Sequence, residues 1–181
     1  PCPWNASTCY AAASCGNVEV LQWVTANGCP CNDEDFVGCF FAAIRSGQVA
    51  TMAWLRAHNQ AALAWGPDLV DYVDDWNDED EGIGPCAIAA GAGQMAALDW
   101  LRSADRVGGS CPWTVDSCMA EALKAYNLST HQPHLYEKLN PVAGPETEEK
   151  RANAKAMIER FLNEGADINT DRYFAGAENE W

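Results

Sequence analysis

Cysteine is the residue type in this chain whose number and spacing could support metal or redox chemistry. The 181 residues include nine cysteines, so at least one thiol would stay unpaired if disulfides form. Two of them stand close together in Cys29-Pro30-Cys31, which is one residue shorter than the C-x-x-C spacing of zinc and thioredoxin-like sites. Buried free thiols, one or two disulfides and a metal site are therefore all open interpretations.

The cysteines belong to a pattern that the chain repeats. Cys2-Pro3-Trp4 recurs as Cys29-Pro30-Cys31 and as Cys111-Pro112-Trp113. Behind the first two copies, and again over residues 86–100, follow small residues, a glycine and aliphatic residues that end in a tryptophan. The corresponding tryptophans are Trp23, Trp54 and Trp100. One structural unit is thus used several times.

Each unit has the pattern of a helical hairpin. Residues 7–14 and 18–26 carry apolar residues at three- and four-residue spacing, and each segment is too short to be stable alone. Every hairpin must therefore bury its apolar stripe on a neighbouring one.

The first helices are expected to end in left-handed turns at Gly16 and Gly93. The second helices are expected to end in the same way at Gly28, Asn59 and Gly165. The N-caps of the first helices are predicted at Ser7 and Thr8 in the first unit and at Asp116 and Ser117 in the fourth.

Two segments carry a resemblance to the ankyrin repeat. Residues 84–93, Gly-Pro-Cys-Ala-Ile-Ala-Ala-Gly-Ala-Gly, resemble its T-P-L-H-x-A-A-x-x-G signature, and residues 161–169 resemble its L-L-x-x-G-A-D-V-N ending. The Cys-Pro-Trp variety is similar to divergent ankyrin proteins of microalgae and large DNA viruses. The resemblance implies an all-α fold, an ankyrin-like solenoid of about four helical hairpins with short β-turn fingers and two long insertions.

This resemblance implies a single ankyrin-like repeat domain over residues 1–181. The units are expected at about 1–28, 29–59, 83–105 and 110–170, with insertions at 60–82 and 127–149 and a tail at 170–181. In the last unit, Ile158 and Phe161 are expected to take the places of Leu21 and Val24.

The repeat positions favour buried free thiols over disulfides and metal. Cys9, Cys86 and Cys118 occupy the place where ankyrin repeats have a buried leucine, which suits a small hydrophobe. His131 and His134 lack helical metal-ligand spacing and are interpreted as loop residues. We therefore expect no cofactor and no metal. Reduced thiols favour an intracellular location, cytoplasmic or organellar, and no targeting segment is visible.

The eight tryptophans divide into three groups. Trp23, Trp54 and Trp100 are expected to pack between units, because a repeated aromatic at a repeated site serves the stack. Trp4 and Trp113 fall at hairpin tips, where ankyrin repeats contact their partners. Three tryptophans outside the pattern either fill the neighbouring core or anchor a partner. These are Trp65, Trp76 and Trp181.

Charge narrows the range of partners. The net charge is −15, and acidic residues gather in the insertion at residues 68–81, where apolar residues at near-helical spacing predict a short amphipathic helix. Nucleic acid is a poor partner for such a chain. The acidic stretch is either a solvated loop, a docking surface for a basic partner or a collector of calcium. No run of apolar residues is long enough to span a membrane.

No arrangement of residues in the sequence supports catalysis, so we expect no enzyme. We expect a non-enzymatic protein-protein interaction module, a structural or scaffold subunit docked in a larger multi-protein assembly. A free regulatory adaptor and a thiol-based redox sensor, with an exposed cysteine such as Cys31 or Cys15, are the alternatives. The resemblance places partner contacts, flanked by Ser14 and Ser46, at Asn5, Asn32, Asp33, Glu34, Arg45, Trp113 and Thr114.

Overall fold

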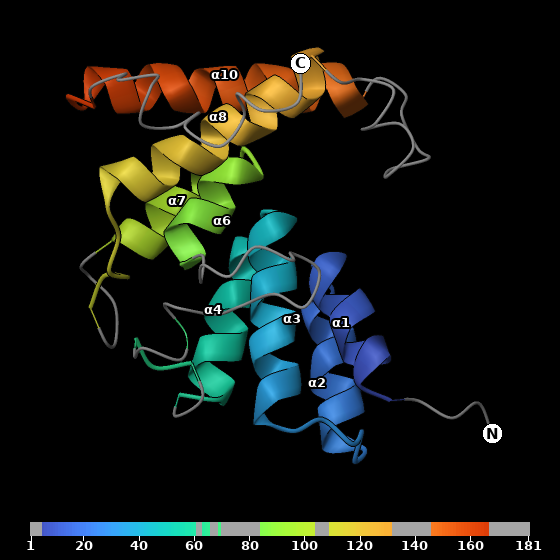
Figure 1. The fold of residues 1–181 in the computed structure, drawn as a ribbon. Helices are drawn as coiled ribbons and strands as arrows, with labels where there is room; N and C mark the ends of the chain where they lie inside the picture. Colours follow the sequence, from blue (N-terminus) through green and yellow to red (C-terminus); the bar gives the residue numbers. More distant parts are fainter. Residues whose placement is uncertain are drawn as a thin grey trace.

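A computed structural model describes residues 5–60, 63–65, 69, 84–103, 109–131 and 146–166 (Figure 1). These residues form helices joined by turns, and none of the described residues lies in a strand. The all-α prediction is therefore confirmed for this part of the chain. The helices are α1 (Ala6–Ser14), α2 (Val18–Ala26), α3 (Asp33–Arg45), α4 (Val49–His58), α6 (Pro85–Gly91), α7 (Met95–Arg102), α8 (Val115–His131) and α10 (Glu146–Asn163).

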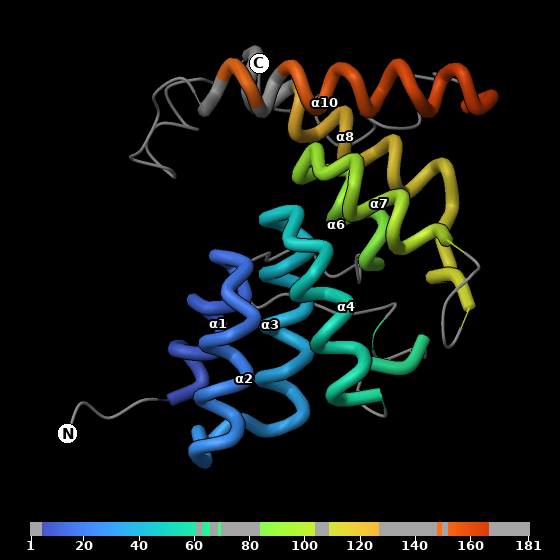
Figure 2. Tube along the Cα trace, turned by 180° about the vertical axis from the view of Figure 1, so that it is seen from behind, coloured from blue at the N-terminus to red at the C-terminus, as the bar shows by residue number. Residues whose placement is uncertain are grey.

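The helices pack as successive antiparallel pairs. α1 packs on α2, α3 on α4, α6 on α7, and α8 on α10. The first helices α1, α3, α6 and α8 contact one another in sequence order, and α2, α4 and α7 form a second row behind them (Figures 1 and 2). Each pair therefore buries its apolar residues mainly against the pairs that precede and follow it.

Glycine turns end the first helices, as predicted. Gly16 and Gly93 have φ values of +74° and +69°, and Gly47 has the same left-handed conformation. At Gly16, the amide of Asn17 donates to the carbonyl of Ala12 over 2.9 Å, the bond that satisfies the end of a helix. At Gly93 a Cβ atom would lie 2.7 Å from Cβ of Asn153 in α10, so glycine also permits the close approach of α10.

The second helices end in two different ways. Gly28 and Gly165 adopt positive φ values of +74° and +94°, as predicted. The prediction for Asn59 was wrong, because its φ is −129° and no non-glycine residue among those described has a positive φ. Nδ2 of Asn59 instead donates to Oδ1 of Asp33 over 2.9 Å. This side-chain contact directs the end of α4 towards the start of α3.

The helix N-caps lie two or three residues before the predicted positions. Asn5 caps α1 in a capping box with Thr8, and Asn32 caps α3 in the same manner with Asp35. Oγ1 of Thr114 accepts from the amide of Ser117 over 3.2 Å at the start of α8. Extended backbone at Asn5 and Asn32 lets each side chain turn back to a free amide of the first turn, which Ser7 inside the helix cannot do.

The core is a strip between the two rows of helices. Its fully buried side chains include Phe40, Ile44, Leu98, Met119 and Phe161, which come from α3, α7, α8 and α10. The insertion at residues 60–82 also contributes to it, since Leu63 and Leu69 are buried in this strip. The remainder of residues 68–81, where the amphipathic helix was predicted, lies outside the described residues. None of the helices described is both long and apolar enough to cross a membrane.

The fourth pair departs from the predicted boundaries. α8 continues to His131 and α10 begins at Glu146, so both ends of the insertion predicted at 127–149 are helical. The interpretation of His131 as a loop residue was wrong, because no helix-breaking residue precedes Pro133. Phe161 is fully buried and Ile158 partly buried against the core, as expected for the displaced half of this unit.

Candidate thiol cluster and interaction surface

Three cysteine side chains meet at the junction between the first two hairpins. Cys9 is buried in α1, whereas Cys29 and Cys31 are half-buried in the connection between α2 and α3. Sγ of Cys9 lies 2.7 Å from Sγ of Cys31 and 3.5 Å from Sγ of Cys29. The sulfur atoms of Cys29 and Cys31 are 3.5 Å apart. We call these three residues the thiol cluster.

The connection between α2 and α3 brings its two thiols to the same place. The positive φ of Gly28 turns the chain back, and the amide of Cys29 donates to the carbonyl of Val24 over 2.9 Å. The amide of Cys31 then donates to the carbonyl of Cys29 over 2.8 Å, which closes a three-residue turn around Pro30. The fixed φ of proline suits the centre of such a turn. A three-residue turn therefore stands here in the place of the expected β-turn finger.

Burial keeps the thiols of Cys9 and Cys31 protonated at neutral pH. It raises the pKa of Cys9 to about 11, and it is also the main cause that raises the pKa of Cys31. The pKa of the neighbouring Cys39 is raised to about 12, again by burial and by its proximity to Cys31. The thiolate is the nucleophilic form of cysteine. The environment of Cys31 therefore disfavours the fast-reacting thiolate that the redox-sensor alternative requires of it.

A related cysteine pair occupies the junction between the last two hairpins. Cys86 in α6 corresponds to Cys9, and Cys111, just before α8, corresponds to Cys29. Both are buried, and a hydrogen bond between their thiols, together with burial, raises the pKa of Cys86. Trp113 stands in the place of Cys31. The first junction thus has three thiols where this one has two thiols and an indole.

Most of the predicted contact residues also hold the fold together. Asn5, Asn32 and Thr114 cap helices, and Asp33 accepts from Asn59. The backbone oxygen of Arg45 accepts from Nε2 of Gln94 over 3.2 Å, which links the second and third hairpins. The structure does not bring these residues together into one pocket.

The remaining predicted contact residues differ in their surroundings. Glu34 is exposed in the first turn of α3, Ser46 is exposed at its end, and Ser14 donates to the carbonyl of Tyr10. The guanidinium of Arg102 lies 3.8 Å from the centroid of the Trp113 ring. Trp76 and Trp181 lie outside the described residues.

Trp65 is engaged inside the molecule. Its Nε1 donates to the carbonyl of Gly109 over 3.0 Å, and the guanidinium of Arg56 lies 3.6 Å from its ring centroid. Its ring is also 6.4 Å from that of Phe40 in the core. Of the two roles predicted for this tryptophan, these contacts correspond to filling the neighbouring core.

The three repeated tryptophans have different environments. Trp100 is buried, with 7% of its surface exposed, and Trp54 is partly buried and stacked on His58. Trp23 is 54% exposed, so the prediction that it packs between hairpins was wrong. Trp23 lies in α2 of the first hairpin, and the part of the chain that the structure describes contains no helix before α1 that could cover it. Tyr10 in α1 and Val20 in α2 are exposed on the same hairpin.

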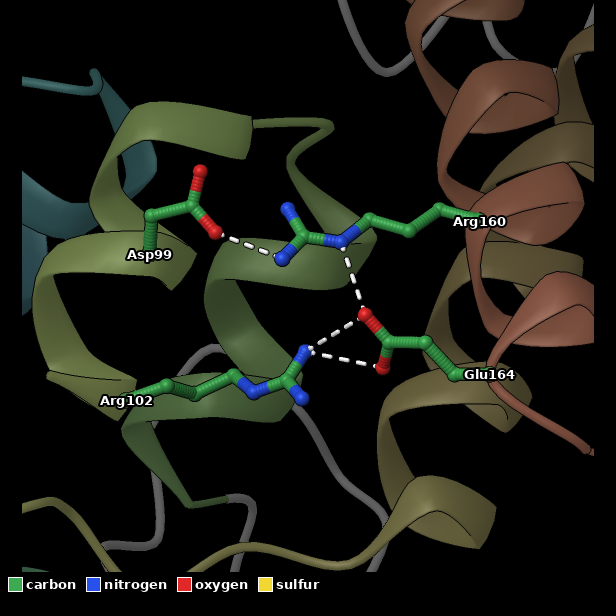
Figure 3. Close-up of polar contacts among 4 residues, drawn as sticks. All are labelled: Asp99, Arg102, Arg160 and Glu164. Carbon is green, nitrogen blue, oxygen red and sulfur yellow. Dashed lines mark hydrogen bonds and ion pairs between the residues drawn. The ribbon is translucent and has the colours of Figure 1, made fainter.

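A charged network joins the last helix to the third hairpin (Figure 3). Nη2 of Arg160 lies 2.6 Å from Oδ1 of Asp99, and its Nε donates to Oε1 of Glu164 over 3.0 Å. Nη1 of Arg102 binds the same carboxylate at 3.0 and 3.2 Å. Burial of Glu164 acts to raise its pKa. Hydrogen bonds from the two arginines outweigh this effect, so the pKa of Glu164 is lowered. This network fixes the end of α10 on α7.

Neither the thiol cluster nor the charged network was predicted from the sequence. Cys9 is more than twenty positions from Cys31, so local spacing gives no sign of their contact. The signal that could have revealed the cluster lies in the repeat. Cys31 stands where the other two copies of the motif have a tryptophan, and Cys29 in the same copy is at a repeat position that lies near Cys9. For the charged network, no periodic pattern relates α7 to α10.

No family model, no curated protein and no solved structure matches this chain.

Proposed function

We propose that this protein is a non-enzymatic protein-protein interaction module, built as an ankyrin-like solenoid and held as a structural subunit in a larger assembly. The succession of helical hairpins supports the proposal, since stacked units of this kind present long surfaces to protein partners. The resemblance of residues 84–93 to the ankyrin signature adds to it. An intracellular location belongs to the same proposal.

The observation that carries the proposal is the exposed apolar surface of the first hairpin. Among the described residues, four large apolar side chains are exposed, and three of them, Tyr10, Val20 and Trp23, belong to α1 and α2. Val20 and Trp23 are three residues apart and share a face of α2. We call these three residues the first-hairpin patch.

Comparison within the chain supports the proposal that a partner covers this patch. The ring of Trp100 in the third hairpin lies 6.4 Å from the ring of Phe40 in the second, so this tryptophan packs back onto the preceding unit. Trp23 holds the same place in the first hairpin and is left exposed. Tryptophan and tyrosine are enriched at the energetic centres of protein interfaces. A protein surface that takes the place of a preceding hairpin would bury the patch.

A basic partner is part of the proposal. The chain carries a net charge of −15, and the first turn of α3, in the hairpin next to the patch, contains Asp33, Glu34 and Asp35. Such a field accelerates association with positively charged surfaces and discourages nucleic acid. The acidic insertion at 68–81 is proposed to contribute to the same docking.

The experiment measures the native size of the protein and combines this with site-specific crosslinking in cells that produce the chain. A photo-reactive amino acid replaces Trp23 in one variant and Lys155, an exposed residue of α10, in the control. We expect the chain to migrate well above the size of a single chain, and position 23 to crosslink to one protein in stoichiometric amount. Position 155 should give no such product.

The outcome separates the structural subunit from the alternatives. Migration at single-chain size, with no crosslink from position 23, would remove the structural-subunit proposal. A free chain that crosslinks from position 23 only in a minor fraction would favour the regulatory adaptor. The redox sensor would instead require a rapidly alkylated cysteine in the native chain, for which exposed Cys15 is the place to look.

A further inference from the structure

We propose that the thiol cluster of Cys9, Cys29 and Cys31 is a binding site for one thiophilic metal ion, Zn²⁺ or Cu⁺. The inference is independent of the proposed interaction role, because it rests on residues at the junction of the first two hairpins. Their three ligand atoms all lie within 4.8 Å of one another. One ion can therefore reach all three sulfurs after small side-chain movements.

The distances fit such an ion after a local expansion. A zinc-thiolate bond is about 2.3 Å, so three thiolates around one ion stand roughly 4 Å apart. The present separations are 2.7, 3.5 and 3.5 Å. Rotation of the half-buried side chains of Cys29 and Cys31 opens the triangle without movement of α1. Their partial exposure also leaves a path for the ion to enter.

The donor set selects the class of metal. Every ligand in this group is a sulfur atom, and the group includes no carboxylate or imidazole. Thiolates favour soft ions such as Cu⁺ and Zn²⁺ over Mg²⁺ and Ca²⁺. Three thiolates complete a trigonal site for Cu⁺, whereas Zn²⁺ would hold a water molecule in a fourth, open position. The two ions share this chemistry, and the experiment distinguishes them.

Binding involves proton release and no redox change. Each thiol loses its proton as its sulfur forms a bond to the ion, so occupation of the site releases up to three protons to solvent. No oxidant is needed. A disulfide between Cys9 and Cys31 is the competing product of this geometry, but it would need an oxidant and would leave Cys29 unused.

The later junction supplies a comparison within the same chain. Cys86 and Cys111 hold the places of Cys9 and Cys29, and Trp113 holds the place of Cys31. The indole offers no metal ligand, and Arg102 lies against its ring. The replacement of tryptophan by cysteine is therefore the feature that converts a packing contact into a three-ligand site.

The test uses the full chain, reduced with a non-thiol reductant and stripped of metal with a chelator. Zn²⁺ and Cu⁺ are titrated separately against a chromophoric chelator for each ion, and Cd²⁺ serves as a probe for thiolate-to-metal charge-transfer absorption. We expect one ion per chain. The ion that competes more strongly identifies the preferred metal.

Variants and thiol mapping locate the site. Cys29→Ser and Cys31→Ser should each weaken binding by at least about tenfold, whereas Cys15→Ser and Cys86→Ala should leave it unchanged. Because a substitution can disturb the fold, the wild-type chain is also alkylated with and without metal. Bound metal should protect Cys9, Cys29 and Cys31, but not Cys15, in peptides analysed by mass spectrometry.

Three results would overturn the inference. The first is the absence of stoichiometric binding by either ion to the folded, reduced chain. The second is equal binding by the wild type and Cys31→Ser, or protection of cysteines outside the cluster. The third is isolation of the native protein with a Cys9–Cys31 disulfide and no metal.

Discussion

The indole of Trp100 and the ring of Phe40 lie 6.4 Å apart, centroid to centroid, with their planes inclined by 58°. The first belongs to α7 and the second to α3, so this contact joins the third hairpin to the second. Tilted aromatic pairs at this separation contribute beyond the area they bury. Trp100 therefore connects its hairpin to the preceding one, whereas Trp54 at the same repeat position stacks on His58 of its own helix.

Trp100→Ala should destabilise the protein far more than Trp23→Ala. Trp100 is 7% exposed, so its removal leaves a cavity next to Phe40 and should lower the free energy of unfolding by about 3–5 kcal/mol. Trp23 is 54% exposed, and its removal should cost less than about 1 kcal/mol. Urea unfolding, followed by far-ultraviolet circular dichroism, measures both. Equal losses in the two variants would contradict the proposed packing of Trp100 onto the second hairpin.

Arg160→Met should loosen the last helix from the third hairpin. Arg160 contacts both Asp99 and Glu164, and 28% of its side chain is exposed, so solvent screens the pairs only in part. We expect a loss of about 1 kcal/mol in the free energy of unfolding. Lys155→Met is the matched control, because Lys155 on the same helix pairs with exposed Glu159 at 3.9 Å and with no other carboxylate among the described residues. Hydrogen exchange of α10 amides should increase in Arg160→Met alone, and an unchanged rate would remove the assigned role.

Low pH should weaken the attachment of α10 to the third hairpin, because it protonates Glu164. Burial opposes ionisation of this carboxyl, yet hydrogen bonds from Arg160 and Arg102 leave its pKa below the ordinary value. A carboxyl with a lowered pKa in the folded state stabilises above its unfolded pKa, about 4.3, and loses this contribution as the pH falls through the folded pKa.

Glu164→Gln should therefore be less stable than the wild type at neutral pH, by about 1 kcal/mol. The difference should shrink as the pH falls below about 4. Urea midpoints measured from pH 7 downwards give the comparison, with exposed Glu159→Gln as the control. A difference that stays constant with pH would mean that the charge of Glu164 is not the cause.

Gly93→Ala should be more harmful than Gly28→Ala. Both glycines have positive φ values, +69° and +74°, so a methyl group strains the backbone at either position by roughly 1–2 kcal/mol. Only at Gly93 would the new Cβ also meet Cβ of Asn153, at 2.7 Å, whereas nothing lies within 4 Å at Gly28. We expect the larger loss of thermal stability in Gly93→Ala, together with displacement of α10. Identical melting temperatures would argue against close packing of α10 on this turn.

The parts of the fold that follow from local rules were predictable from the sequence. Apolar spacing located the helices of the first hairpin to within one residue, and the glycine positions located their ends. Asn59 escaped prediction because a contact with Asp33, distant in sequence, overrides the usual preference of asparagine at a helix end. The N-cap of α1 was missed because Ser7 and Thr8, which are also good capping residues, lie only two and three residues after Asn5.

The candidate sites depended on geometry that the sequence does not encode locally. Repeat alignment places Cys9 and Cys29 at core positions, but it does not reveal that the turn around Pro30 brings a third sulfur beside them. Trp23 is the opposite case, because here the repeat predicts packing between hairpins that the structure lacks. Its repeat position predicts burial, and only its location in the first hairpin of the row explains its exposure.

The pairing of α8 with α10 has a consequence for the order in which the chain can fold during its synthesis. The first three hairpins each pair helices that follow one another closely, so the second and third can pack on the preceding hairpin as they leave the ribosome. α8 must wait until the residues up to α10 have emerged, because Met157 and Phe161 complete its side of the core. Until then the apolar face of α8 around Met119 has no cover from its own hairpin. Apolar surface that is exposed during such an interval is prone to aggregation.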